Sequence, residues 1–424
     1  MPPRDDDAGY SRRRLLRTGG ATLGVGLTAS LAGCPSGIPP LSSPISFGRL
    51  DAPAPAADGY AKWIPAASEF ETDDEEAGLG HAWHAQPARL SESVFGPGSL
   101  PVGLTTGQLG YFGVGYRNYE RAIAVLSPFV RVAIADFDRA TVADAVDGTG
   151  YEEGEPHHGY AVYERSDVPR AVAVDDGVLV YGQSGSDDPD AARARVETVI
   201  DAGAGRVPRQ TEADSAFGTL VERAGSRPAN WLGSAPFGGL GQSSSPALDS
   251  LVTSSISWDY DDAGVYFVYD LVFPEGERAP AGAIKDALQD QRRAVESALV
   301  DVETDGRFAR IEMRLTREAV RDTSPGNGHP QITWGVEHDR AEGTVTFRHE
   351  AGERADPAQL SIDGAGDAAP FEGVGVFEPG DSVTVPVVDP DDRLQIVYSS
   401  PDGDSSMALF GYTVPEDDTG GGTE

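Results

Sequence analysis

The sequence predicts an α+β protein with two related α/β units whose sheets are mainly antiparallel, followed by a small C-terminal β-sandwich. Three patterns support this fold class. Between residues 121 and 203 the apolar runs follow the order β-β-α-β-β-β-α, which favours helices packed on one face of an antiparallel sheet. A comparable succession returns between residues 251 and 315. Beyond residue 331 only short alternating strands are expected, without a helical period.

The chain begins with the three parts of an export signal. Ser11-Arg12-Arg13-Arg14-Leu15-Leu16-Arg17 is positively charged, the stretch from Ala21 to Ala32 is apolar, and small residues follow. Because the apolar stretch is shorter than the ~20 residues that cross a bilayer, we interpret residues 1–34 as a signal, not a permanent span. Arg12 and Arg13 resemble the pair of the twin-arginine motif, which implies export of the folded protein.

The only cysteine, Cys34, ends this segment. Leu31-Ala32-Gly33-Cys34 resembles the lipobox of lipoproteins, which implies cleavage before Cys34 and lipidation of that residue. A single acyl chain holds a protein only marginally, so we expect a second lipid chain or a binding partner to contribute. These features predict a lipid-anchored protein on the extracytoplasmic face of the cell membrane. The proline-rich residues 35–58 are expected to form an extended tether.

The first α+β unit is expected to span residues 59–226. Asp138 is expected to cap a short helix, because its side chain can accept amide hydrogens of the first turn. Asp175-Asp176-Gly177 predicts a tight turn, and Asp188-Pro189 predicts the start of a helix that ends at Gly203. The other expected elements are strands over 121–126, 129–137, 160–164, 171–174 and 178–181, and a helix with Phe217, Leu220, Val221 and Ala224 on one side.

The second α+β unit is expected to span residues 227–322. Trp63 and Trp231 stand at similar points ahead of the two units, which suggests a diverged duplication. One apolar stripe predicts a helix that carries Ile284, Leu288, Val295 and Leu299. The expected strands cover 251–258 and 265–273, and then 300–303 and 309–315 as a hairpin around Asp305-Gly306.

Residues 323–330 read as a linker, residues 331–415 as the β-sandwich and residues 416–424 as a disordered tail. The strands expected in the sandwich cover 332–336, 344–348, 382–388, 393–398 and 407–414. The run from Asp392 to Pro415 resembles the C-terminal β-sandwich of archaeal type IV pilin-like proteins. This chain lacks the long N-terminal pilin helix, so filament assembly does not carry over.

Charge restricts the solvent and the partners of the protein. The chain has 68 acidic and 33 basic residues, a formal charge of −35, and its only lysines are Lys62 and Lys285. This composition resembles the proteins of extreme halophiles, in which molar salt shortens the Debye length to ~3 Å and screens self-repulsion. A nucleic-acid partner is excluded because it would require a basic surface.

Histidines are the first candidates for chemistry. His81 and His84 are three residues apart and offer part of a metal site on a helix, but no third ligand is fixed by spacing, so surface or packing roles are favoured. His157-His158 is expected in a solvated loop. His349-Glu350-Ala351-Gly352-Glu353 lacks the second histidine of the zinc-protease motif and falls in an expected strand.

Other motifs are weaker. Gly364-Ala365-Gly366-Asp367-Ala368-Ala369 matches a dinucleotide fingerprint only in letters, since no helix follows it. Gly182-Gln183-Ser184-Gly185-Ser186 is out of register for a nucleophile elbow, and no phosphate-binding P-loop is present. The acidic loops 389–392 and 402–404 are expected to be turns in preference to calcium sites. Loop 238–245 is either a partner-binding loop or a connection. Trp63, Trp231, Trp258 and Trp334 are expected to be core or interface residues and not a ligand platform.

These observations predict a non-enzymatic, lipid-anchored surface protein that binds another envelope component, with no catalytic residue, cofactor or metal ligand assigned. Two alternatives stay open: a solute-binding lipoprotein, and an exported hydrolase or metal-dependent enzyme whose site is not visible as a motif. The segments 135–138, 159–163 and 171–180 resemble exported haloarchaeal lipoproteins of unknown function and are similar to a bacterial family of uncharacterised surface proteins with two α/β halves.

Overall fold

The computed structural model contains helices and many mainly antiparallel strands, which confirms the α+β class. In the part of the chain that it describes, no helix is both long and apolar enough to cross a bilayer. The described residues are 46–57, 59–70, 82–125, 130–184, 189–234, 248, 250–290, 299–321, 328–366, 368–388, 393–401, 403 and 406–415.

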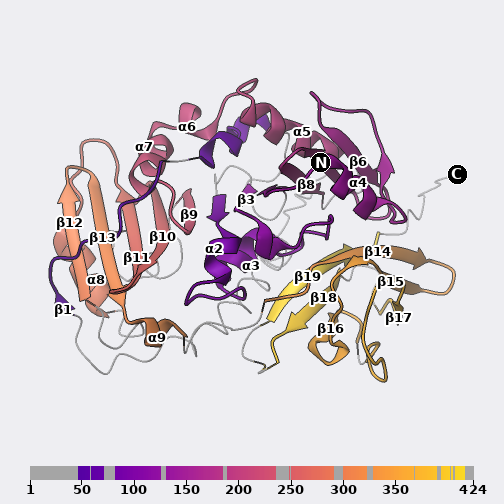
Figure 1. The fold of residues 1–424 in the computed structure, drawn as a ribbon. Helices are drawn as coiled ribbons and strands as arrows, with labels where there is room; N and C mark the ends of the chain where they lie inside the picture. The colour runs from indigo at the N-terminus through magenta and orange to yellow at the C-terminus, as the bar shows by residue number, and fades with distance from the viewer. Residues whose placement is uncertain are drawn as a thin grey trace, which may run out of the picture.

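One sheet of 13 strands runs through most of the molecule (Figure 1). Its spatial order is β1-β12-β13-β11-β10-β9-β2-β3-β4-β8-β7-β6-β5, and the pair β1–β12 is its parallel contact among the described strands. The strands are β1 Ser46–Phe47, β2 Ala82–Ala85, β3 Arg121–Val125, β4 Val130–Ile134, β5 Glu152–Glu153, β6 Ala161–Arg165, β7 Arg170–Asp175, β8 Val178–Gln183, β9 Ala229–Ser234, β10 Thr253–Asp261, β11 Gly264–Val272, β12 Leu299–Asp305 and β13 Phe308–Leu315.

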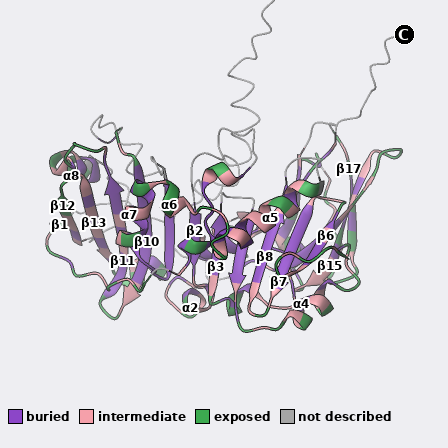
Figure 2. Ribbon diagram, turned by 90° about the horizontal axis from the view of Figure 1, so that it is seen from above, coloured by how far each residue is buried: buried purple, intermediate pink, exposed green. Residues whose placement is uncertain are grey.

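Helices cover both faces of this sheet, which corrects the expectation that they pack on one face. Val142 of α4 and Ile284 of α8 belong to one hydrophobic cluster, whereas Val196 of α5 and Leu220 of α7 belong to another. The central strands are buried on both faces (Figure 2), because they are nearly continuous runs of apolar residues. The helices are α2 Pro87–Ser91, α3 Leu100–Thr106, α4 Arg139–Val146, α5 Pro189–Gly203, α6 Gln210–Ala213, α7 Ser215–Ala224, α8 Ala281–Asp290 and α9 Arg317–Arg321, with 3-10 turns η1 Ala61–Trp63, η2 Ala67–Glu69, η4 Tyr116–Asn118 and η6 Pro357–Gln359.

Several local signals in the first part of the chain are confirmed. The Asp138 side chain accepts the amide hydrogen of Thr141 at 2.9 Å and caps α4. The turn before β8 places Gly177 at a φ of 73°, where glycine is favoured over residues with a Cβ. The predicted apolar side of α7 is buried, as are the four tryptophans that were expected in the core or at an interface: Trp63, Trp231, Trp258 and Trp334.

The two halves of the main sheet have a matching order. β2 and β9 pair at the centre, and Trp83 of β2 lies opposite Trp231 of β9. Outward from β2 the order is β3-β4-β8-β7, and outward from β9 it is β10-β11-β13-β12. In both halves a helix lies between the second and third of these strands in the chain, α4 in one and α8 in the other. The structure therefore places Trp83, and not Trp63, at the position that corresponds to Trp231.

The second half of the predicted tether is bound to the main sheet. The backbone of Ser46 and Phe47 pairs with β12, and the Leu50 amide donates to the Asp301 carboxylate at 3.1 Å. The Ala52 amide donates to the Glu312 carboxylate at 3.1 Å. Residues 46–57, which we call the N-terminal arm, thus lie along the sheet because strand edges and carboxylates satisfy their amides. Residues 35–45 and Asp58 are outside the described residues.

One predicted helix does not include all the residues assigned to its apolar stripe. α8 is described over Ala281–Asp290, and Leu299, which was placed on its apolar stripe, instead lies in β12 and pairs with Arg314 of β13. Val295 lies outside the described residues. An apolar stripe cannot distinguish a helix turn from the first residue of a strand when the two share a buried face.

The C-terminal residues form two three-stranded sheets, β14-β15-β17 and β16-β18-β19. Both sheets contribute to one hydrophobic cluster, which includes Trp334, Phe347 and Phe410. This C-terminal unit packs beside α3, where the Gln331 amide group bonds to the Gly110 carbonyl at 2.8 Å and to the Tyr116 amide at 2.8 Å. The strands are β14 Ile332–Asp339, β15 Thr344–Gly352, β16 Leu360–Asp363, β17 Ser382–Pro386, β18 Arg393–Ser399 and β19 Ser406–Thr413.

Candidate functional site

A polar cavity lies where the main sheet meets the C-terminal unit. β6 ends at Arg165, and the turn that follows it reaches the strands β14 and β15. The cavity has a volume of about 300 Å³. We call this junction the seam. Its lining residues are Gly150, Arg165, Ser166, Asp167, Gly335, Val336, Glu337, Thr346, Arg348 and Glu350.

Arg165 joins the two parts of the chain at the seam. Its Nε and Nη2 each donate to the Asp167 carboxylate at 2.6 Å, and its Nη1 donates to Glu350 of β15 at 2.7 Å. Its side chain is only 2% exposed and lies 5.1 Å from the centroid of the Tyr151 ring. Burial alone would lower the pKa of Arg165, but the bonds with Asp167 and Glu350 outweigh burial and raise it. The guanidinium is therefore a permanent, fixed cation.

Asp167 extends the same network to the edge strand β14. Its carboxylate accepts the amide hydrogen of Val336 at 2.9 Å, while Arg170 donates to the carbonyl of Trp334 at 2.8 Å. Burial alone would raise the pKa of Asp167, but hydrogen bonds from Arg165 and the charge of Arg170 lower it. Two backbone groups of β14 are thus satisfied by side chains of the main sheet.

Two glycines allow the charged side chains to approach. A Cβ at Gly150 would lie 2.5 Å from Nη2 of Arg165, and a Cβ at Gly335 would lie 2.3 Å from Oε1 of Glu350. Both distances are shorter than real carbon contacts, so with any larger residue the ends of these two side chains would have to shift. The position of the carboxylate and the guanidinium at the cavity depends on these two glycines.

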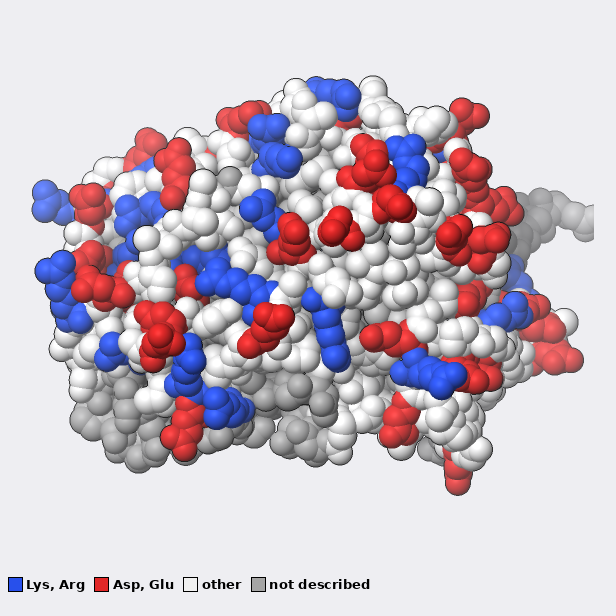
Figure 3. Space-filling view, in the orientation of Figure 1, with Lys and Arg blue, Asp and Glu red and all other residues white. Residues whose placement is uncertain are grey.

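The lining of the cavity is polar and charged. Its charged groups have both signs, with Arg348 near Glu337 at 3.7 Å on the exposed rim. The hydroxyls in the lining, Ser166 and Thr346, have no histidine beside them in the lining set. In Figure 3 acidic and basic side chains are interspersed over the face shown, with no single-sign patch that would recruit a partner by charge alone.

A further buried arginine lies near the seam on β4. Arg131 is paired in register with Tyr181 of β8, and its side chain donates only a long bond, 3.4 Å, to the Val130 carbonyl. Its Nε has no partner, and no carboxylate among the described residues contacts it. Burial lowers the pKa of Arg131 to about 10. This guanidinium is a desolvated charge that nothing described neutralises.

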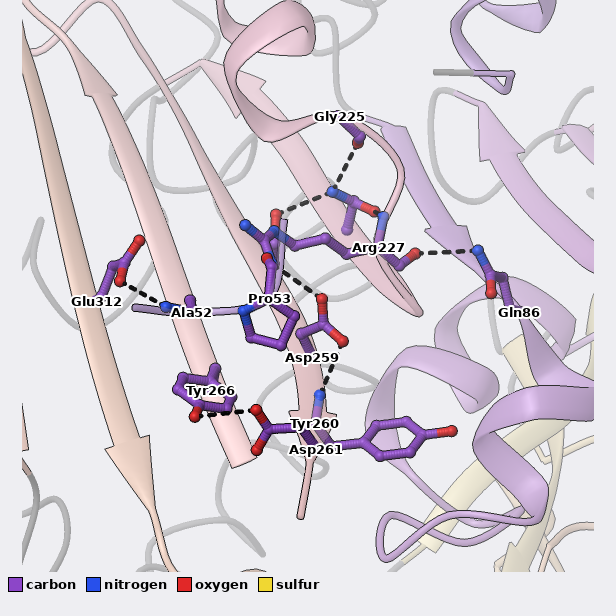
Figure 4. A network of polar contacts seen from close by, with 12 residues as sticks. Ala52, Pro53, Gln86, Gly225, Arg227, Asp259, Tyr260, Asp261, Tyr266 and Glu312 are labelled. Carbon is purple, nitrogen blue, oxygen red and sulfur yellow. Dashed lines mark hydrogen bonds and ion pairs between the residues drawn. The ribbon is translucent and has the colours of Figure 1, made fainter. Parts of the chain in front are cut away.

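A second polar network lies at the centre of the main sheet (Figure 4). Arg227 donates to Asp259 of β10 at 2.9 Å and to the carbonyl of Pro53 in the N-terminal arm. The side chains of Arg227 and Asp259 are 1% and 5% exposed. Asn230 of β9 accepts the amide hydrogen of Arg227 at 3.1 Å and donates to Ser257 at 2.9 Å. These contacts fasten the arm to the sheet, and none of these residues lines the seam cavity.

His84 belongs to that central network and not to a helical metal site. It lies in β2, its ring stacks on Tyr60 at 4.6 Å, and Nδ1 is 3.3 Å from Oδ1 of Asn230. Burial lowers its pKa to about 4. His81 is outside the described residues, so the two histidines are not seen together. His84 is a packed core histidine.

The other candidates divide between described and undescribed residues. His349 lies in β15, as expected, where Nε2 is 2.9 Å from the carbonyl oxygen of Glu353. His157 and His158 are brought together with Asp201 of α5. The export residues Arg12 and Arg13, the lipidation residue Cys34, loop 238–245 and acidic positions 389–392, 402 and 404 lie outside the described residues.

The sequence reasoning missed the seam. Arg165 and Glu350 are 185 positions apart, so no local motif joins them. The available signal was that β6 ends in an arginine and β7 begins with one, Arg165 and Arg170, and that both are buried. Buried arginines at strand ends require carboxylate partners, and acidic residues later in the chain can supply them.

Comparisons with known proteins give limited information. No protein-family model matches the chain, and no curated protein matches it significantly. Two solved structures of TP0453 are weakly similar: crystal form I is 10% identical over 64% of this chain and 98% of that chain, with a TM-score of 0.37. Crystal form III is 9% identical over 65% of this chain and 98% of that chain, also with a TM-score of 0.37. A similarity at this level supports no conclusion about the fold or the function of the present chain.

Proposed function

We propose that the protein is a lipid-anchored surface protein of a halophile that binds another envelope component non-catalytically, and that the seam cavity is its binding site. The anchor is lipidated Cys34, delivered by the signal that contains Arg12 and Arg13, and the protein faces the extracytoplasmic side of the membrane. The observation that carries the binding site is the cavity of about 300 Å³ lined by fixed charges of both signs.

The lining favours a polar segment of a macromolecule over a small apolar ligand. Small-molecule sites are usually 300–1,000 Å³ and mostly apolar. The seam cavity is at the lower limit of that range and is lined by ion-paired side chains and glycine backbone. It also borders β14, whose Val336 amide and Trp334 carbonyl are already satisfied by Asp167 and Arg170, so a ligand would contact mainly the charged side chains of the lining. We therefore propose a charged or polar polypeptide segment of an envelope protein as the ligand.

The architecture is consistent with this role as a display scaffold. We infer that the two halves of the main sheet are related units that diverged after duplication, supported by their matching strand order around β2 and β9. We interpret the two sheets of the C-terminal unit as a β-sandwich, supported by the single hydrophobic cluster that they share. Such a unit, fastened to the main sheet by Arg165, forms one wall of the proposed binding site.

Site-directed cross-linking in cells tests the binding site. Ser166 is exposed and lines the cavity, whereas Ser361 of β16 is exposed and does not. A cysteine-directed photo-cross-linker is attached to Ser166→Cys or Ser361→Cys in molar KCl. The proposal predicts one partner protein captured from position 166 and not from position 361. Recovery of a free solute at position 166 would favour a solute-binding lipoprotein instead.

Membrane attachment is tested separately. The substitution Cys34→Ala should release the protein from the membrane fraction, and replacing Arg12 and Arg13 with lysine should block its export. Both effects are measured by fractionation and immunoblotting. A Cys34→Ala variant that stays fully membrane-bound would show that the anchor is elsewhere, without bearing on the seam.

A further inference from the structure

Two adjacent histidines and one aspartate converge on the surface of the first half of the main sheet. His157 and His158 lie in the tight turn between β5 and β6, and Asp201 lies in the last turn of α5. Nε2 of His157 is 3.2 Å from Oδ1 of Asp201, and Nε2 of His158 is 3.5 Å from the same oxygen. One ligand atom from each of the three residues lies within 4.8 Å of the others.

These separations fit a transition-metal shell. Donor atoms bound tetrahedrally at 2.0–2.1 Å from a zinc ion are about 3.3 Å apart. The two measured nitrogen–oxygen distances, 3.2 and 3.5 Å, lie on either side of that value. Two imidazoles in a three-ligand set disfavour Ca²⁺ and Mg²⁺, which prefer oxygen ligands.

The second nitrogen of His157 provides an independent observation. Its Nδ1 faces Oε1 of Glu197 at 3.6 Å, one helical turn before Asp201 on α5. Metal-binding histidines almost always direct their other ring nitrogen to a carboxylate, a carbonyl or water, which fixes the ring. Glu197 is itself held by Nε of Arg193 at 2.7 Å, and Arg193 also bonds to Glu164. The supporting carboxylate is therefore preorganised.

The position on α5 also favours a bound cation. The C-terminal end of a helix carries partial negative charge, which attracts cations. The last turn of α5 contains Asp201 and no basic residue, although Arg209 beyond it donates to the Ala202 carbonyl at 3.0 Å. Arg206 lies 3.4 Å from Asp201, but its side chain is 44% exposed and can move into solvent.

We propose that His157, His158 and Asp201 bind a divalent transition-metal ion of the zinc type, with Glu197 orienting His157. Three protein ligands leave a fourth position open to water or to a ligand from another molecule. The site lies in the first half of the main sheet, its residues are absent from the seam lining, and the inference does not depend on the proposed function.

Cobalt binding tests the site, because Co²⁺ replaces zinc and its visible absorption reports tetrahedral coordination. The full chain is titrated with Co²⁺ in molar KCl, which suppresses weak binding to surface carboxylates. We expect one saturable site in the wild type. The double variant His157→Gln/His158→Asn should lose at least ~100-fold in affinity, and Glu197→Gln should lose ~10-fold. Asn is chosen at position 158 because His158 has a φ of 46°, which Asn tolerates.

Two further variants separate the site from general effects. His338→Asn, at a histidine of β14 outside the cluster, should bind Co²⁺ as the wild type does. Arg206→Gln removes the competing cation and should tighten binding several-fold, a gain that misfolding cannot produce. The proposal is overturned if the wild type shows no saturable absorption, or if the double variant binds Co²⁺ as tightly as the wild type.

Discussion

Arg165 at the seam and Arg227 at the centre of the main sheet are both buried guanidiniums that join distant parts of the chain. Arg227 connects the N-terminal arm to β10 through Pro53 and Asp259, and Arg165 connects β6 to β15 through Asp167 and Glu350. They differ in what surrounds them. The seam opens into a cavity of about 300 Å³ whose lining includes Arg165, and Arg227 is absent from that lining.

The difference separates stability from binding. At the centre, the charges are fully enclosed, so their contribution is to hold the arm on the sheet. At the seam, Arg165 is also buried, but its partners Asp167 and Glu350 are 22% and 10% exposed and line the cavity, where these carboxylates can contact a ligand. The central network should therefore dominate the unfolding free energy, and the seam should dominate recognition.

The largest expected effect on stability is at the centre. Arg227→Met removes one partner of a buried pair and leaves Asp259 without its closest cation, which should cost about 3–5 kcal/mol of unfolding free energy. Urea unfolding in molar KCl measures this change. Arg317→Met is the matched control, because its ion pair with Asp262 is exposed and should contribute about 0–1 kcal/mol. Equal losses in the two variants would contradict the assignment.

Acid should weaken the centre of the main sheet and the contact with the C-terminal unit through buried histidines. His84 lies in the central network, His329 stacks on Tyr116 beside the C-terminal unit, and burial lowers the pKa of each to about 4. Because the unfolded state takes up protons near pH 6.5, stability is complete above that pH and falls as the pH drops toward 4. Each histidine should contribute roughly 3 kcal/mol to this loss.

Unfolding measured at pH 7, 6, 5 and 4 follows this loss, and His84→Phe should remove about half of it by keeping the stacking on Tyr60 without a titrating group. An unchanged pH profile in His84→Phe would show that His84 is not the residue that titrates.

A smaller effect is expected at the seam. Glu350→Gln leaves Arg165 with Asp167, so it should cost about 1–3 kcal/mol. Glu350→Gln should also weaken partner capture from position 166. Arg227→Met should leave capture unchanged when equal amounts of folded protein are compared. Differential scanning calorimetry and the cross-linking assay together measure the two effects. If Glu350→Gln lowered the stability but left partner capture from position 166 unchanged, the role of the seam would be structural only.

The smallest expected effect has the opposite sign. Arg131 is a buried cation without a described carboxylate partner, so Arg131→Met should stabilise the protein by about 1 kcal/mol. Urea unfolding measures this gain. A clear loss of stability would mean that Arg131 is neutralised by a contact outside the described residues.

Much of the fold could be predicted because it is encoded locally. The strands β3, β4, β7 and β8 are runs of apolar residues with turns between them, and Asp138 signals its own helix. β16 was missed because it has only four residues, too few for a period to be recognised. The burial of both sheet faces could not be predicted, because the sequence of a strand does not tell which helices, distant in the chain, pack on its two faces.

The sites could be predicted only in part because their residues are far apart in the chain. His157 and His158 were noticed as a pair, but Asp201 is 44 positions from His157 on another element. Arg165 and Glu350 were not connected at all. Their association depends on where the C-terminal unit docks, which is set by packing and not by any local pattern.

The central claim is that the seam binds a partner through its cavity, and two alanine substitutions test it most directly. In Gly335→Ala the new Cβ would lie 2.3 Å from Oε1 of Glu350, whereas the Cβ of Gly375→Ala, in the same unit, would contact nothing within 4 Å. Partner capture is measured from Ser166→Cys in both backgrounds. The account predicts that capture is lost with Gly335→Ala and retained with Gly375→Ala. Equal capture in the two backgrounds would contradict it.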